Sequence, residues 1–425
     1  MWWKRKLDLR GLIFFSGSLA PTFQEVHQWQ QPGLEVEGIP PGNDEIWAAT
    51  LRHRVWGRAR LSAVRGIEPL TEDDVRFASG ITETERETIL RDAQSALVLE
   101  MTSQADDVLR ERKRFLRFMA AVMGTRGVVA LDLMAQTFWT PGRLADELRH
   151  DAALDIVHIH VFHAVTQPGG IWLHSHGLSE LGFVDFDVLR PAEALLGGNQ
   201  FDLLRSIAFH IVEGASSGVI EPAVGAEPVA LVDAPTFMRS ASSADRQLRD
   251  PENHSDRRVV CCDAGAPGLL RRLLGSGEVA PSRFLSRGMI EGKHLIRFSD
   301  FSTDLTTTRA RESLPLLNPF RQEFEELQCT ALVKLGYRTD SGRDGREHLW
   351  FEVHGVSGDS IDATLVNQPF DIASLKVGDR DNRPAELLTD WAVMTPLGAL
   401  TPRSLEVARK LREKRSLLLE YLRSQ

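Results

Sequence analysis

Cysteine is scarce in this chain of 425 residues, which contains three: Cys261, Cys262 and Cys329. An odd number of cysteines gives no disulfide framework, and the sequence has no Cys-x-x-Cys pair of the kind that binds zinc. If Cys261 and Cys262 lie on a strand, their side chains point to opposite faces. We therefore expect three reduced thiols in a cytoplasmic protein.

Long apolar runs are also missing. The N-terminus has the positive charge of a signal peptide, but its apolar segment, Leu12 to Phe15, is only four residues long and follows Asp8 and Arg10. A secretory core needs roughly 7–15 apolar residues, and a membrane span needs about 20. The sequence therefore predicts neither a signal peptide nor a transmembrane segment.

An excess of basic charge is the third absence. The formal net charge is −9, and a general nucleic-acid-binding protein normally carries a basic surplus, so we expect no nucleic-acid partner. No phosphate-binding Gly-rich loop, dinucleotide fingerprint or His-Glu-x-x-His zinc motif occurs either. Hydrophobic residues make up 42% and charged residues 26% of the chain, which is typical of globular proteins.

Strand-like and helix-like segments alternate along the chain in an order that indicates an α+β fold with more than one domain. The clearest helix runs from Asp106 to Met123, and a second begins at Thr140-Pro141, with the threonine as cap. The expected parts are an N-terminal α+β region (1–95), a His-rich α+β domain (96–238), a linker and poorly defined region (239–317), a C-terminal α+β module (318–395) and a C-terminal amphipathic helix (396–425). Within the third part, the polar run 239–258 is the expected linker. Strands mixed with helices in this way predict small mixed or antiparallel sheets packed against helices.

Five of the thirteen histidines fall within 19 residues. They are His158, His160, His163, His174 and His176, on two expected strands around Pro168-Gly169-Gly170. Residues i and i+2 of a strand share a face, so each His-x-His pair presents both rings on one side. Imidazole nitrogens bind zinc, iron, nickel and copper, and we therefore select His158, His160, His174 and His176 as candidate ligands of a divalent transition metal.

The register of the hairpin decides whether these rings converge. If Val165 pairs with Ile171, His160 faces His176 and all four candidate ligands share one face. If Thr166 pairs with Ile171, His163 faces His174 and the first pair lies on the opposite face. A slip of one residue reverses every side chain, and the sequence leaves both registers open.

Carboxylates close to the hairpin supply candidate catalytic residues. Glu180, Asp185 and Asp187 could complete a coordination sphere or act as a base, and Glu180 and Asp187 are the candidate catalytic residues. The His174-Ser175-His176 segment resembles the His-Ser-His of JAMM metalloproteases; Asp187 occupies the family's aspartate position, but Val184 stands where the family has serine. The competing interpretation is that these histidines are interior or edge-strand residues with ordinary partners.

From Pro319 onward the pattern predicts a short helix followed by three strands, Thr330–Tyr337, Arg346–His354 and Ser360–Asn367. On the middle strand Leu349, Phe351 and Val353 form one face. Glu347, His348 and Glu352 on the same strand are a candidate site, although Glu347 and His348 could instead anchor the strand to a neighbouring loop.

Four motifs in this region carry a resemblance. They are the segment 347–353 (Glu-His-Leu-Trp-Phe-Glu-Val), the segment 365–369 (Leu-Val-Asn-Gln-Pro), Val377-Gly378-Asp379 and Asp390-Trp391. In order and spacing they resemble the signature of domain-of-unknown-function 2314, over roughly 75 residues. The resemblance implies a bacterial origin and a compact α+β fold, and it implies no activity.

Two functions follow as hypotheses. The first is a non-catalytic binding or regulatory protein, with another protein as a candidate partner. The second is a metal-dependent hydrolase that uses the hairpin from His158 to His176, with Asp187 or Glu180 assisting. Binding of the basic C-terminal helix to a membrane surface is a third, weaker hypothesis.

Overall fold

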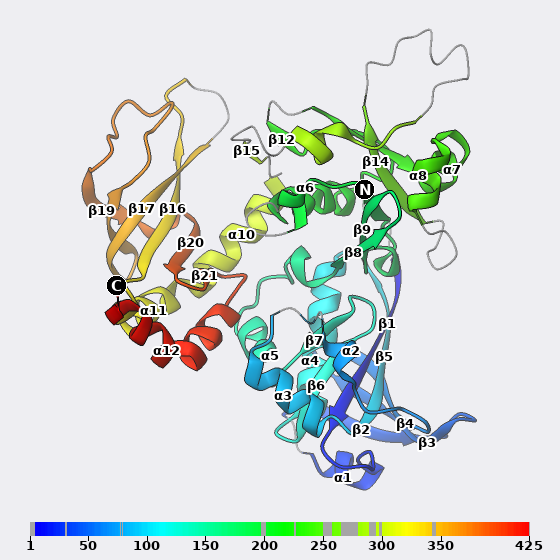
Figure 1. Cartoon of the computed structure of the whole chain (residues 1–425). Helices are drawn as coiled ribbons and strands as arrows, with labels where there is room; N and C mark the ends of the chain where they lie inside the picture. Colours follow the sequence, from blue (N-terminus) through cyan, green and yellow to red (C-terminus); the bar gives the residue numbers. More distant parts are fainter. Residues whose placement is uncertain are drawn as a thin grey trace.

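The computed structural model describes residues 5–29, 32–76, 78, 80–196, 201–224, 227–249, 257–264, 279–288, 295–296, 300–341 and 346–424. These residues form an α+β fold with three large mixed or antiparallel sheets, a two-stranded ribbon and helices packed against the sheets (Figure 1). The fold class expected from the sequence is confirmed.

The first sheet has seven antiparallel strands in the order β2-β3-β4-β5-β1-β6-β7. Its strands are β1 (Arg5–Phe15), β2 (Leu34–Ile39), β3 (Glu45–His53), β4 (Gly57–Val64), β5 (Ser95–Ala105), β6 (Gly127–Asp132) and β7 (Thr137–Trp139), and its helices are α1 (Phe23–Gln28), α2 (Glu72–Val75), α3 (Glu83–Asp92), α4 (Val108–Met123) and α5 (Pro141–Leu148). The expected helix from Asp106 is α4, which Asp107 caps, and Thr140 caps α5. Because β1 pairs with β5 and β6, this sheet crosses the expected boundary at residue 95.

Strand β1 is longer than the four-residue strand expected at Leu12 to Phe15. Asp8 and Arg10 do not interrupt it, because they alternate with the buried Leu7 and Leu9 and point outward. The alternation of buried and exposed side chains that defines a half-buried strand therefore begins before Leu12, at Leu7.

The second sheet holds the histidine hairpin and has the order β11-β13-β14-β10-β9-β8, in which β10 and β14 are parallel. Its strands are β8 (Val161–Gln167), β9 (Gly170–His176), β10 (Asp185–Leu189), β11 (Gly218–Ile220), β13 (Val229–Asp233) and β14 (Arg258–Asp263). One face packs in the main core with helix α6 (Phe201–Val212), and the other packs on α7 (Ala234–Ser240) and α8 (Ser243–Leu248). The ribbon is formed by β12 (Ala223–Val224) and β15 (Leu295–Ile296).

The expected linker at 239–258 is partly helical. Asp233 caps α7, Ser242 caps α8, and the buried Leu248 anchors α8 on the second sheet. These caps and single apolar contacts support short helices in a segment that shows almost no apolar periodicity. Residues 250–256 of this expected linker lie outside the described part of the chain.

The third sheet forms the C-terminal module, with antiparallel strands in the order β19-β18-β17-β16-β20-β21. Its strands are β16 (Thr330–Arg338), β17 (Arg346–Ser357), β18 (Ser360–Leu365), β19 (Arg380–Pro384), β20 (Leu388–Thr395) and β21 (Gly398–Leu400), and its helices are α10 (Asp300–Ser313), α11 (Leu317–Glu323) and α12 (Glu406–Ser424). Leu349, Phe351 and Val353 are buried in the module core, as the alternation predicts.

Helix α12 packs on its own protein. Val407, Ala408 and Leu411 are buried, and four basic side chains pair with acidic residues of the same chain: Arg409 with Asp146, Arg412 with Glu323, Lys414 with Glu83 and Arg415 with Glu326. Within the described residues, no helix is long and apolar enough to cross a membrane.

Candidate metal centre on the β8–β9 hairpin

The hairpin adopts the second of the two registers considered above. Thr166 pairs with Ile171, and His163 lies directly opposite His174. The register follows from a two-residue turn in which Pro168 is followed by Gly169 at φ +101°, a left-handed conformation that suits glycine.

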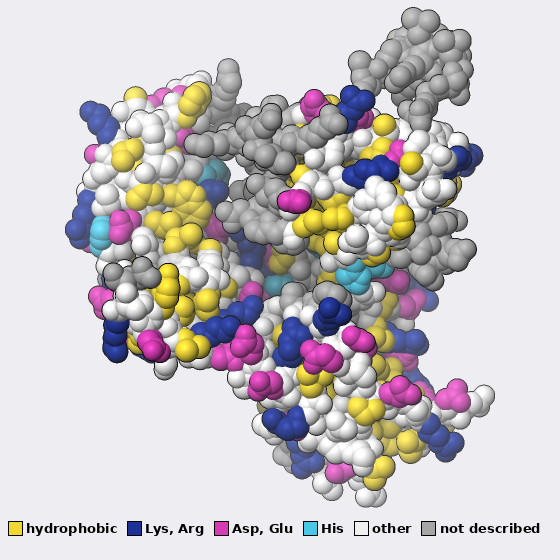
Figure 2. All heavy atoms as spheres, in the orientation of Figure 1, with side chains coloured by type: hydrophobic (Ala, Val, Ile, Leu, Met, Phe, Trp, Pro, Cys, Tyr) yellow, Lys and Arg dark blue, Asp and Glu magenta, His cyan; other side chains and the backbone are white. Residues whose placement is uncertain are grey.

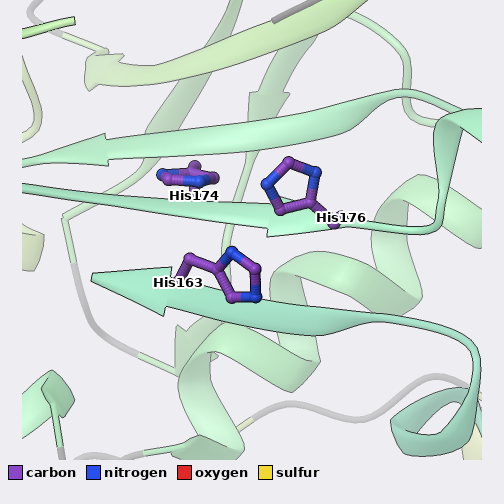
Figure 3. A group of neighbouring side chains, drawn as sticks. All are labelled: His163, His174 and His176. Carbon is purple, nitrogen blue, oxygen red and sulfur yellow. The ribbon is translucent and has the colours of Figure 1, made fainter. Parts of the chain in front are cut away.

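Three histidines converge in this register. His174 and His176 come from β9 and His163 from β8, and their rings gather beside the two strands (Figure 3). Each offers a nitrogen, and these nitrogens all lie within 4.8 Å of one another. The ring centroids are 5.6 Å apart for His163 and His174, and 4.8 Å apart for the other two pairs.

This spacing fits a metal ion after small side-chain rotations. A tetrahedral zinc ion bound at about 2.0–2.1 Å holds its nitrogen ligands roughly 3.3 Å apart, so the histidine nitrogens must approach one another by at most about 1.5 Å. His174 is buried, with its ring 4.2 Å from that of buried Trp172, whereas His163 is partly exposed at the edge of the sheet. The partly exposed rings are therefore the ones with room to rotate.

His158 and His160, two of the four ligands selected from the sequence, do not belong to this group. His158 follows Asp155 in a 3-10 turn rather than a strand, with Nε2 3.6 Å from a carboxylate oxygen of Glu147. His160 donates from Nδ1 to the carbonyl of Ile156 at 2.8 Å. Among the described residues, the sequence therefore identified two members of the converging group, His174 and His176, and placed the third, His163, only in its alternative register.

Asp187 lies opposite His174 on the neighbouring strand β10, but its carboxylate already has two partners. Arg249 Nε donates to one oxygen at 2.9 Å, and Arg258 donates to the other at 2.7 and 2.9 Å. All three side chains are buried. A carboxylate held by two guanidinium groups is a poor general base, because their N–H donors already occupy its lone pairs.

Glu180, the other candidate catalytic residue, lies exposed in the 3-10 turn Ser179–Leu181. It is not part of the converging group in the described chain. Asp185, between these two carboxylates, accepts hydrogen bonds from Ser175 and from the backbone of Leu178 and Ser179, and so holds the turn after β9.

The candidate residues of the C-terminal module do not converge. The carboxylate of Glu347 accepts from the backbone N–H groups of Phe370 and Asp371, at 2.6 and 2.8 Å. His348 Nδ1 lies 3.0 Å from the Thr389 hydroxyl, and burial lowers the pKa of His348 to about 4. Glu352 is exposed on the same strand. These contacts tie β17 to a loop and to β20.

A buried histidine gives a prediction about pH. Burial is the main cause that lowers the pKa of His158 to about 4, and Arg143 and Arg309 oppose its protonation further, while Glu147 and Asp155 favour it. The unfolded chain binds this proton near pH 6.5 and the folded chain only near pH 4, so the free energy of unfolding should fall as pH drops through this window. For one such histidine the full loss is about 3 kcal/mol.

Urea unfolding at pH 7.0 and pH 4.5 checks this expectation. His158→Gln should show a smaller loss between the two pH values than the unchanged chain. His27→Gln, at an exposed position on α1, is the matched control and should keep the original loss. Equal losses for all three proteins would show that His158 is not the group responsible.

The fold and this site define an α+β protein with a candidate three-histidine metal centre. Residues 309–405 match the model of a family described as an uncharacterized protein conserved in bacteria (DUF2314). The match covers the last five residues of α10, all six strands of the third sheet and α11, and it ends just before α12. The resemblance seen in the sequence motifs is therefore confirmed for this region. Comparison of the chain with curated proteins and with solved structures gives no match.

Proposed function

We propose that this protein is a non-catalytic binding or regulatory protein that holds one divalent transition metal ion at His163, His174 and His176. The observation that supports the metal site is the convergence of three imidazole nitrogens within 4.8 Å on a two-stranded hairpin. Three neutral imidazoles are a common ligand set for zinc and leave a fourth coordination position open. Histidine side chains gather at the surface where β8 and β9 lie, so an ion can enter from solvent (Figure 2).

The non-catalytic part of the proposal rests on the surrounding carboxylates. Asp187 is the carboxylate opposite His174, and Arg249 and Arg258 neutralise it. A hydrolytic metal site normally needs a group that takes a proton from the bound water, and Asp187 is not available for that role. Its ion pairs instead fix strand β10 beside the hairpin.

A metal titration tests this proposal. Protein stripped with a chelator should bind one Zn²⁺ per chain, and His163→Ala, His174→Ala or His176→Ala should each weaken binding more than about 100-fold, since even outer partners of metal ligands contribute 10–100-fold. The exposed His27→Ala is the control and should bind like the original chain. Binding that survives loss of His174, or that never reaches one ion per chain, would exclude this site.

A metal-dependent hydrolase is the second candidate, and the open fourth position of a three-histidine site favours it. A zinc-activated water there would cleave an activated ester such as 4-nitrophenyl acetate. Turnover that requires Zn²⁺ and is lost in His174→Ala would favour the hydrolase. Zinc binding without such turnover would favour the non-catalytic protein.

A further inference from the structure

A cavity of about 700 Å³ lies where the first sheet meets the segment that leads into β8. Its walls come from the segment around α2, the end of β6 with the turn into β7, the segment from Val157 to His163, and Arg205 of α6. Sites for small organic ligands usually measure roughly 300–1,000 Å³. The cavity is therefore large enough for a ligand of this kind.

Large apolar side chains form much of the described lining. They come from both sheets and from the segment before α2, and they include Leu70, Leu131, Leu133, Phe138, Val161 and Phe162. Such walls favour a ligand with an apolar body, because burying its surface removes it from water. The polar side chains of the lining decide which polar groups that ligand carries.

His160 supplies a hydrogen-bond acceptor to the wall of the cavity. Its side chain lines the cavity and is only 5% exposed. Its Nδ1 lies 2.8 Å from the carbonyl oxygen of Ile156, and because a carbonyl only accepts, Nδ1 carries the proton. Burial lowers the pKa of His160, so the ring stays neutral and Nε2 keeps its lone pair. Nε2 can therefore accept a hydrogen bond from a hydroxyl group of a ligand.

Arg205 brings a positive charge to the same wall. It lies on α6, which packs on the face of the second sheet that Phe162 also contacts, and both side chains line the cavity. The rings of Phe162 and His160 are 4.8 Å apart. Burial is the largest cause of the lowered pKa of His160, and the charge of Arg205 acts in the same direction. A carboxylate that binds the guanidinium N–H groups of Arg205 would therefore lie close to His160.

Two carboxylates on another wall disfavour a second negative charge on the ligand. Asp73 and Asp74 of the short helix α2 line the cavity and are exposed. Hydrogen bonds from the hydroxyl and backbone of Thr71 lower the pKa of Asp74, so its carboxylate stays ionised. A ligand with acidic groups at both ends would place one of them near these aspartates, at a cost in affinity.

We propose that this cavity binds a small 2-hydroxy monocarboxylic acid with an apolar body, whose carboxylate meets Arg205 and whose hydroxyl donates to Nε2 of His160. A hydroxyl on the carbon next to the carboxylate places one donor beside one anionic group, as the two polar side chains of this wall require. His163 also lines the cavity, but its ring shares the other face of the sheet with that of His174. The ligand site is therefore independent of the proposed metal centre.

Calorimetric titration of the full chain provides the test, in the presence of EDTA to keep metal ions away from the histidines. The probe is mandelate, a 2-hydroxy acid with a phenyl body. Phenylacetate lacks the hydroxyl and should bind about three- to tenfold more weakly, which is the usual contribution of one hydrogen bond. Lactate keeps the carboxylate and the hydroxyl but has a methyl group in place of the phenyl ring, and it should bind at least about tenfold more weakly.

Two substitutions assign the two polar contacts. His160→Asn keeps a donor for the carbonyl of Ile156 and removes Nε2, so mandelate should lose its advantage over phenylacetate. Arg205→Gln removes the positive charge and should weaken the binding of both acids more than about tenfold, since hydrogen bonds to charged groups contribute more than neutral ones. His27→Asn, at an exposed position on α1, is the matched control and should leave both affinities unchanged.

A variant that fills the cavity tests where the acid binds. Leu133→Trp should abolish the binding of mandelate, and Leu70→Trp, on another wall, is a second variant in case the first is unstable. Val219→Trp, at an exposed position of β11 away from the cavity lining, is the matched control and should bind mandelate like the original chain.

The outcomes bear on the cavity alone, because EDTA removes the metal from the experiment. If mandelate fails to bind, or binds equally well to the filled variants, the cavity is not its site. If mandelate and phenylacetate bind the original chain equally well, or if His160→Asn keeps the preference for mandelate, the role of His160 is wrong. In each case the metal proposal stands or falls by its own titration.

Discussion

Glu147→Gln should lower the free energy of unfolding by about 3–5 kcal/mol, the usual cost of removing one partner of a buried ion pair. Glu147 on α5 receives two hydrogen bonds of 2.8 Å from Arg309 on α10, and Lys113 lies 3.6 Å away. Burial alone would raise the pKa of Glu147, but the charge and hydrogen bonds of Arg309 outweigh it and lower the pKa to about 2. An amide at this position removes the carboxylate that is hydrogen-bonded to the buried Arg309 and lies closest to the buried Lys113.

This buried pair also joins two parts of the chain. Arg309 is the first residue of the region that matches the bacterial family, and its guanidinium also donates to the carbonyls of Ala153 and Pro402. The loss of Glu147 should therefore weaken the attachment of the C-terminal module to the first sheet. Exchange of amide hydrogens in α10 should become faster in the variant.

Glu326→Gln is the matched control for the same substitution. Glu326 pairs with Arg415 on α12, and both side chains are more than 40% exposed. Exposed pairs of this kind contribute about 0–1 kcal/mol, so urea unfolding should barely change. If Glu147→Gln lowered the free energy of unfolding no more than Glu326→Gln does, the buried pair would not stabilise the fold.

Asp187→Asn should cost a similar 3–5 kcal/mol, for the same physical reason. Arg249 and Arg258 are almost fully buried, and Asp187 is the carboxylate that pairs with both. The variant leaves two guanidinium groups facing a neutral amide. Strand β10 should loosen, and metal binding at the neighbouring hairpin should weaken as a secondary effect.

Asp362→Asn, in an exposed pair with Arg380, is the matched control and should cost less than about 1 kcal/mol in urea unfolding. The result also tests the role of Asp187. A catalytic base would give a variant of nearly normal stability that loses turnover. A variant of normal stability would therefore contradict the structural role assigned to this carboxylate.

Much of the fold follows from local sequence patterns. Helix α4 has its cap and its apolar stripe within 17 residues, and the alternation of Leu349, Phe351 and Val353 defines the buried face of β17. Such signals depend on residues that lie close together in the chain, so they can be identified from the sequence alone. The apolar pattern alone predicts too short a strand at β1, because Asp8 and Arg10 form the outward half of an alternating strand and carry no apolar signal.

The site was only partly predictable for a different reason. The set of histidines was visible, but their convergence depends on a register that one turn decides, and a slip of one residue exchanges His163 for His160. The ion-pair partners of Asp187 could not be predicted from the sequence, because Arg249 and Arg258 follow it by 62 and 71 residues. No local pattern connects residues so far apart.

The position of a bound metal ion tests the central claim most directly. Crystals grown with Zn²⁺ and measured at the zinc absorption edge should show one anomalous peak among His163, His174 and His176, about 2.0–2.1 Å from a nitrogen of each. The His174→Ala protein should lose this peak. A peak at other residues, or an empty site in crystals of protein that binds zinc in solution, would contradict the assignment.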